Sequence, residues 1–281
     1  MRDIVRAELF KLRKRPAAWV LLATAAVLNQ IFSYLVPYLS YRAGDAQSFA
    51  GNIPPQEVLA STLPDQLVIN TIGGFPVFAG ALALVLGALM FGGEYGWGTV
   101  KTMLSQRPGR SSVLGAQLVA LGVAMLVCVS VLFALSAAST AGIALAEDKA
   151  MHWPSVAALA EGFGAGWLVL VVWGSLGAVL GVTLRGVALP IGLGVVWVLG
   201  IENLVSAMAS NVLTALRPLR DVLPGVNAGS LVSAVMPDRV IDPPPGVTAS
   251  VAEPRALVTL VCYLAACAAL AIWATRQRDV T

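Results

Sequence analysis

The sequence predicts an all-α membrane protein: six transmembrane helices, an N-terminal helix at the membrane surface, a short cytoplasmic helix, and an outer segment that could re-enter the membrane. Hydrophobic residues make up 58% of its 281 residues and charged residues only 12%, and its mean hydropathy is +0.81. A soluble domain of this length could not hide so much apolar surface. Six runs reach the roughly 20 apolar residues that a membrane crossing needs, and we treat 1–281 as one transmembrane domain. The spans are 17–37, 72–91, 113–137, 156–184, 187–208 and 256–273.

The distribution of positive charge predicts the orientation. With the N-terminus in the cytoplasm, twelve of the 18 Lys and Arg residues fall on the inner side and six on the outer side. Because cytoplasmic loops retain Lys and Arg, we expect both termini on the cytoplasmic side of the cell membrane. The net charge is only +3 and the basic residues are scattered along the chain, so we expect no nucleic-acid partner.

Residues 2–15, RDIVRAELFKLRKR, are amphipathic at helical spacing. Apolar side chains share one face and basic ones another: Val5, Leu9 and Leu12 against Arg2, Arg6 and Arg13. This pattern predicts a helix in the headgroup region, which Pro16 ends before the first span. The alternative is a basic flank that only orients the protein.

The connections between spans differ in character. Residues 38–71 and 142–155 should be outer loops, whereas only Arg185 and Gly186 separate the fourth and fifth spans, which predicts a tight cytoplasmic hairpin. The longest outer segment, 209–254, has apolar residues at near-helical spacing on both sides of Pro224. It could dip into the membrane as short helices where protein covers them, although a folded surface cap would show the same pattern.

Motifs of catalysis are absent from the sequence. The single histidine excludes HExxH and histidine-cluster metal sites, and no GxSxG motif occurs. No GxxxxGK[ST] loop is present to hold the phosphates of ATP. The three cysteines all fall inside predicted spans and offer neither a disulfide framework nor a metal cluster. We therefore predict no catalytic, cofactor-binding or metal-binding residues and no enzymatic activity of the chain by itself.

Two carboxylates fall near the outer ends of predicted spans. Glu202, with its neighbour Asn203, lies toward the end of the fifth span, and Glu161 lies at the start of the fourth. A carboxylate in hydrocarbon is expensive and therefore a functional candidate, but at the headgroup boundary it would cost little. Proton-coupled transport usually needs a chain of such groups, which this sequence lacks.

Charges also gather between the second and third spans, in GGEYGWGTVKTMLSQRPGR. Trp97, Val100 and Leu104 follow a helical spacing, and Arg107, Pro108 and Gly109 would end the helix. We predict a short amphipathic helix over 94–107 whose apolar side could enter a groove on a cytoplasmic partner. The alternative is a helix resting on lipid, with ordinary cytoplasmic positive charge.

At these residues the sequence resembles the membrane subunits of type-2 ATP-binding cassette (ABC) transporters. AELFKLRKRP precedes the first span, and LGIENLVSAM ends the fifth. GGEYGWGTVKTMLSQRPGR resembles the family pattern GxEYxxGTxxxLLxxxPxxR. Lys101 and Thr102 depart from that pattern, where arginine is common.

The resemblance implies a mechanism and roles for residues. Two permeases would pair above two separate ATPase subunits, which would bind the ATP, and closure of the ATPases would rock spans two and five. Residues 2–15 would be the elbow helix, with Arg6, Lys11 and Arg13. The coupling candidates are Glu94, Tyr95, Trp97, Lys101, Met103, Leu104 and Arg107. The pathway or gate candidates are Glu202, Asn203, Leu219, Leu223 and Pro224.

From this resemblance we expect the permease subunit of an ATP-driven exporter of an amphiphilic substrate such as a drug, peptide or lipid. Its expected partners are a separate ABC ATPase, a second copy of itself or a related permease, and membrane lipids. Two alternatives are a non-transporting scaffold or immunity-type protein and a gradient-driven secondary transporter. The sequence does not specify the substrate, the direction of transport, or a homodimer over a heterodimer.

Overall fold

The structure is a computed structural model that describes residues 2–44, 53–96, 110–211, 213–236 and 243–277. Every element in these ranges is helical, which confirms the all-α prediction. Six helical segments are long and apolar enough to cross a membrane. They are Pro16–Ala43, Pro64–Glu94, Ser112–Ala146, Val156–Leu184, Ala188–Ser210 and Glu253–Ala274.

The first three spans are longer than the sequence predicts. Helix α1 (Arg2–Lys14) precedes span one, which is built from α2 (Pro16–Gln30), η1 (Ile31–Leu35) and α3 (Val36–Ala43). After α4 (Pro55–Ala60), span two combines η2 (Pro64–Gln66), α5 (Leu67–Ile72), η3 (Phe75–Ala79) and α6 (Gly80–Gly96). Span three is α8 (Arg110–Ala146). The expected outer loop over 38–71 is thus largely helical where it is described, because polar residues that look like loop in sequence lie on helix extensions.

The second half of the chain contains the other three spans. Span four is α9 (Val156–Leu184), which Ser155 caps by accepting a hydrogen bond from Ala158 N at 3.1 Å. Span five combines α10 (Ala188–Val196), η4 (Trp197–Ile201) and α11 (Glu202–Asn211). The outer segment holds η5 (Thr214–Leu216), α12 (Arg217–Arg220) and α13 (Pro224–Ala234), and α14 (Glu253–Gln277) is span six.

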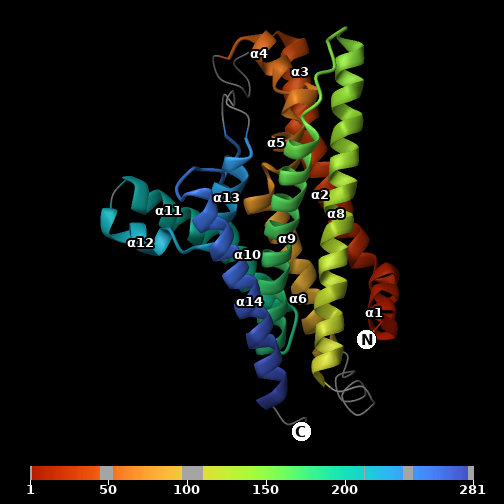
Figure 1. Cartoon of the computed structure of the whole chain (residues 1–281), viewed down its shortest axis with the longest axis vertical. Coiled ribbons are helices and arrows are strands. Elements are labelled where there is room, and N and C mark those ends of the chain that lie inside the picture. The colour runs from red at the N-terminus through yellow and green to blue at the C-terminus, as the bar shows by residue number, and fades with distance from the viewer. Residues whose placement is uncertain (1, 45–52, 97–109, 212, 237–242, 278–281) are drawn as a thin grey trace.

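Spans two and four form the centre of the bundle (Figure 1). In each of them 61% of the most apolar stretch is buried, against 11–28% in the other four spans. The large side chains that fill this centre include Trp173, Phe75 and Leu170. Exposed apolar residues such as Phe32, Val196 and Val258 cover the outer spans, as expected when lipid rather than water surrounds a protein.

Glycines let the backbones of α6 and α9 touch. A Cβ on Gly177 would overlap with the carbonyl oxygen of Leu84, and one on Gly87 would overlap with that of Gly174. Small residues permit this close approach of membrane helices. The helix that Gly177 meets at this close distance is α6 of span two.

Polar groups join the outer halves of spans one, two and three. The Asn29 side chain donates to the carbonyl of Asn70 at 2.8 Å and accepts from the Ser136 hydroxyl at 3.1 Å. Thr140 donates to the carbonyl of Thr62 at 2.7 Å. Hydrogen bonds between membrane helices satisfy polar groups that lipid cannot, so those of Asn29 hold span one against spans two and three.

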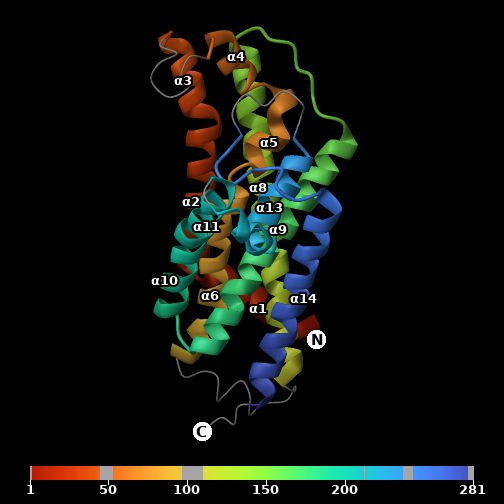
Figure 2. The ribbon, with the colours of Figure 1, turned by 90° about the vertical axis from the view of Figure 1, so that its left-hand side faces the viewer.

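The outer segment has two parts with different surroundings. Helix α13 packs against α9 and α14 and contributes a run of buried residues from Val226 to Val232. Helix α12, together with α11 at the end of span five, instead projects from the side of the bundle in Figure 1 and points toward the viewer in Figure 2. Of the two readings of this segment, the burial of α13 among the spans favours an inserted helix over a surface cap for residues 224–234.

The contact between α6 and α9 predicts a test of stability. Gly177→Ala should lower the free energy of unfolding by about 1–3 kcal/mol, because the new methyl group must push two backbones apart. Thermal unfolding of the purified protein in mild detergent would measure the loss. Gly164→Ala on the same helix is the matched control, since a Cβ there meets nothing within 4 Å. Equal melting temperatures for the two variants would contradict this account of the contact.

Candidate functional site

The first candidate site is a charge cluster where the N-terminal helix meets the end of span two. Arg15 lies between α1 and α2 in an extended conformation, which the following Pro16 favours. Its guanidinium donates to Glu94 Oε1 at 3.0 Å and to the carbonyl oxygen of Leu89 at 3.2 Å. Lys11 approaches the same carboxylate at 3.8 Å and pairs with Glu8 at 2.8 Å.

This cluster offsets an unfavourable arrangement. Glu94 belongs to the last turn of α6, where the partial negative charge of the helix end repels a carboxylate. Its side chain is only 9% exposed, so water solvates it poorly. Two cations from the N-terminal segment therefore stabilise Glu94 and fasten α1 to the C-terminal end of span two.

The structure corrects the predicted start of the helix over 94–107. Glu94 and Tyr95 belong to α6, which continues without a break from span two to Gly96. Trp97, Lys101, Met103, Leu104 and Arg107 lie outside the described residues. Residues 97–109 link α6 to α8, so the cluster lies immediately before the segment with the predicted coupling residues. Among the predicted elbow residues, Lys11 joins the cluster, whereas Arg6 and Arg13 are exposed.

The second candidate site surrounds Glu202 in span five. Its side chain is buried, and one carboxylate oxygen accepts from Trp197 Nε1 at 2.8 Å while the other accepts from Gly225 N at 2.8 Å. Gly225 is in the first turn of α13, where a helix exposes N–H groups and partial positive charge. Glu202 therefore caps α13 and ties it to span five. Glu161, the other carboxylate considered, is exposed.

The π-helical turn η4 brings Trp197 and Glu202 together. Residues five apart in a regular α-helix point about 140° away from each other, since each residue advances about 100°. A π-helix pairs residue i with i+5, so it places these two side chains on one side of span five. Such turns occur frequently at functional sites.

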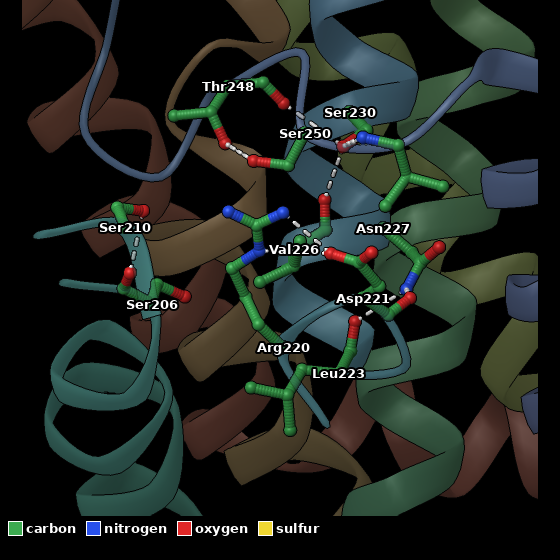
Figure 3. Close-up of polar contacts among 11 residues, drawn as sticks. Ser206, Ser210, Arg220, Asp221, Leu223, Val226, Asn227, Ser230, Thr248 and Ser250 are labelled. Atoms are coloured by element: carbon green, nitrogen blue, oxygen red, sulfur yellow. Dashed lines mark hydrogen bonds and ion pairs between the residues drawn. The ribbon is translucent and has the colours of Figure 1, made fainter. Parts of the chain in front are cut away.

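Polar contacts hold α13 on its other sides (Figure 3). Ser230 Oγ lies 2.8 Å from the Val226 carbonyl and 3.0 Å from that of Thr248, and it accepts from Val251 N at 3.2 Å. The Asn227 amide donates to the carbonyls of Asp221 and Leu223 at 3.0 and 2.8 Å. Arg220 pairs with Asp221 at 2.7 Å at the end of α12. Helix α13 is therefore held by polar groups on several sides, not by apolar packing alone.

The structure brings together only part of the predicted gate. Leu223 and Pro224 are buried at the start of α13, beside the Gly225 that Glu202 binds. Leu219 is 54% exposed on α12, and the exposed Asn203 donates to the carbonyls of Val198 and Leu199 in the same span. Sequence reasoning missed Trp197, Gly225 and Ser230, and the Pro224-Gly225 pair was the available signal for a helix start.

The described residues contain no cluster of three His, Cys, Asp or Glu side chains that could hold a metal ion.

Comparison with protein-family models matches residues 2–280 to the family described as ABC-2 family transporter protein. The chain belongs to the ABC-2 transporter family. This match confirms the resemblance seen in the basic N-terminal stretch and in the segment after span two. No curated protein matches the chain.

Membership implies that this ABC-2 protein is a multi-pass membrane component of a transport system, without an ATPase domain of its own. Members of the family normally work with an ABC ATPase. The two sites lie on different spans: Glu94 at the C-terminal end of span two, and Glu202 between span five and α13.

The pairing of Arg15 with Glu94 predicts coupled effects on stability. Arg15→Gln and Glu94→Gln should each lower the free energy of unfolding by about 1–3 kcal/mol, because each removes one of the partners of a poorly solvated charge. The double variant should lose less than the sum of the two, and a double-mutant cycle of unfolding in detergent would measure the difference. Arg6→Gln removes an exposed charge from the same helix and should have little effect. Strict additivity of the two changes would show that the pair does not contribute.

Proposed function

We propose that this ABC-2 protein is the permease subunit of an ATP-driven exporter and is energised by a separate ATPase bound on the cytoplasmic side. The observation that carries the proposal is the cluster of Arg15, Lys11 and Glu94. It braces the last turn of span two where the chain enters 97–109, the segment that resembles the family's coupling helix. Force applied to that segment would pass directly into α6.

Force on α6 would reach the centre of the bundle. Gly177 holds α9 against the backbone of α6, and Gly194 in α10 packs against the side chain of Leu84. A push on span two therefore displaces span four with it and bears on span five. These contacts support alternating access, in which the central spans rock between inward-facing and outward-facing arrangements.

The Glu202 site would carry that motion to the outer side. Because its carboxylate binds Trp197 in span five and Gly225 in α13, a rotation of span five either moves α13 or breaks a hydrogen bond. Helix α13 fills the space between α9 and α14. We propose that it acts as the outer gate and that Glu202 links the gate to span five.

The orientation, the second permease, the substrate class and the site of ATP binding are further parts of this proposal. We place the protein in the cell membrane with both termini on the cytoplasmic side, since the cluster at Glu94 and the basic segment 2–15 then lie on the side that retains Lys and Arg. We expect a second permease, a copy or a relative, to complete the pathway. The apolar spans favour an amphiphilic substrate such as a drug, peptide or lipid, by analogy with the fold. ATP would be bound by the partner subunit, with no cofactor on this chain.

Purification from the native host tests the proposed ATPase partner. Mass spectrometry of the tagged chain in mild detergent should find a stoichiometric protein with a Walker A loop. Leu104→Asp should remove that protein, because a charge on the apolar side of the predicted coupling helix opposes docking. Leu104→Met, which keeps the side chain apolar, is the matched control. A well-folded chain that never carries an ATPase would instead favour a scaffold or a secondary transporter.

Labelling of a buried cysteine tests the link between Glu202 and the gate. Val232 is fully buried in α13, so Val232→Cys should react slowly with a membrane-impermeant maleimide once the native cysteines are replaced. Glu202→Gln should speed labelling about tenfold or more, since the amide cannot accept both N–H groups and a hydrogen bond to a charged group contributes about 1.5–3 kcal/mol. Glu161→Gln, at an exposed carboxylate, should leave the rate unchanged. Equal rates in both variants would refute the link.

A further inference from the structure

A cavity of about 240 Å³ lies between α1, α2, α6 and α8 and belongs to neither candidate site. It exceeds the roughly 150 Å³ of an engineered cavity that binds benzene. Leu12 of α1, Leu22 of α2, Leu86 of α6 and Ala124 of α8 are among the apolar side chains that line it. A space with such walls excludes water and favours a hydrocarbon chain.

The end of this cavity near α1 has a different character. Arg13 is the one charged residue of its lining, and Trp19, also in the lining, donates from its indole nitrogen to the Arg13 carbonyl at 2.8 Å. Both residues are exposed, so the cavity reaches the surface beside them. Tryptophan and basic residues are typical of the level of lipid headgroups. This end therefore has the features of a membrane–water interface.

Positive charge at the mouth is available to a ligand. Among the described residues no carboxylate pairs with Arg13, in contrast to Arg15 and Lys11 two residues to either side. Lys14 lies 5.7 Å from the centre of the Phe10 ring and is exposed next to Arg13. An anionic headgroup would complement these two cations, while its acyl chain could enter the apolar space behind them.

We propose that this cavity is a binding site for an anionic phospholipid of the surrounding bilayer. One acyl chain lies between α1 and spans one, two and three, and the headgroup phosphate lies against Arg13 and Lys14. Because Leu9 and Leu12 form the wall that α1 contributes, the lipid fills the space under the N-terminal helix. It thereby supports the helix that carries Lys11 to Glu94 and that ends beside Arg15.

Native mass spectrometry of the full-length chain tests the headgroup assignment. The detergent-purified protein, with any partner that co-purifies, is titrated with palmitoyl-oleoyl phosphatidylglycerol or with the phosphatidylcholine of the same chains. We expect one phosphatidylglycerol per chain, bound about 30-fold more tightly than phosphatidylcholine, from the usual contribution of about 1 kcal/mol for each of two basic residues near an anionic lipid. Arg13→Gln should reduce the preference about fivefold, and Arg6→Gln, an exposed arginine of α1 outside the lining, should leave it unchanged. An unchanged preference in Arg13→Gln would overturn the headgroup assignment.

Filling the cavity tests the position of the acyl chain. Ala124→Phe should weaken the binding of both phospholipids at least tenfold, because the new ring occupies the space of several methylene groups. Ala134→Phe lies on the same helix at an exposed position outside the lining and is the matched control. Should Ala124→Phe fail to fold, Ala18→Phe fills the same cavity from α2. Either folded filling variant with the lipid affinity of the unchanged chain would overturn the proposal.

Discussion

The direct contact between the backbones of α6 and α9 is the constraint on which the rest of the structure depends. Close approach at Gly177 and Gly87 leaves no side chains between the two helices, so they cannot slide past each other without separating. Every other span packs around this pair and keeps much of its apolar surface outward. The bundle therefore has a rigid centre and a periphery that meets lipid or partner subunits.

The two buried carboxylates each connect a span to a helix that packs beside the spans. Glu94 is in the last turn of α6 and is held by Lys11 of α1 and by Arg15, whereas Glu202 is on span five and is held by an indole and by the start of α13. Each therefore joins a span to a helix that is not itself a span, α1 for Glu94 and α13 for Glu202. A buried charge is stable only with partners, so neither carboxylate can change its surroundings without a compensating rearrangement nearby.

Apolar run length was enough to predict six spans, because the bilayer imposes a minimum length that composition makes visible. The same reasoning placed the ends poorly. Span two begins with Pro64 and Asp65, a pair that is typical of a loop in sequence.

The candidate site was only partly predictable from the sequence. Glu202 stood out as a charge in an apolar run, but its partner Gly225 is 23 residues away and is brought near only by tertiary packing. Arg15 was visible only as one of several basic residues, since nothing local marks the one that reaches Glu94.

The π-turns have a consequence for how span five relates to its neighbours. An extra residue in a turn rotates everything beyond it about the helix axis relative to a regular α-helix. The N-terminal half of this span, with Gly194, is thus aligned with Leu84 of span two, while the C-terminal half, with Glu202, is aligned with α13. The side chains of one continuous helix consequently face two different partners at rotations that a regular α-helix would not provide together. If η4 had regular α-helical geometry, one of those two alignments would be lost. This single turn therefore sets how the side chains that face α13 are rotated about the helix axis relative to those that face the core of the bundle.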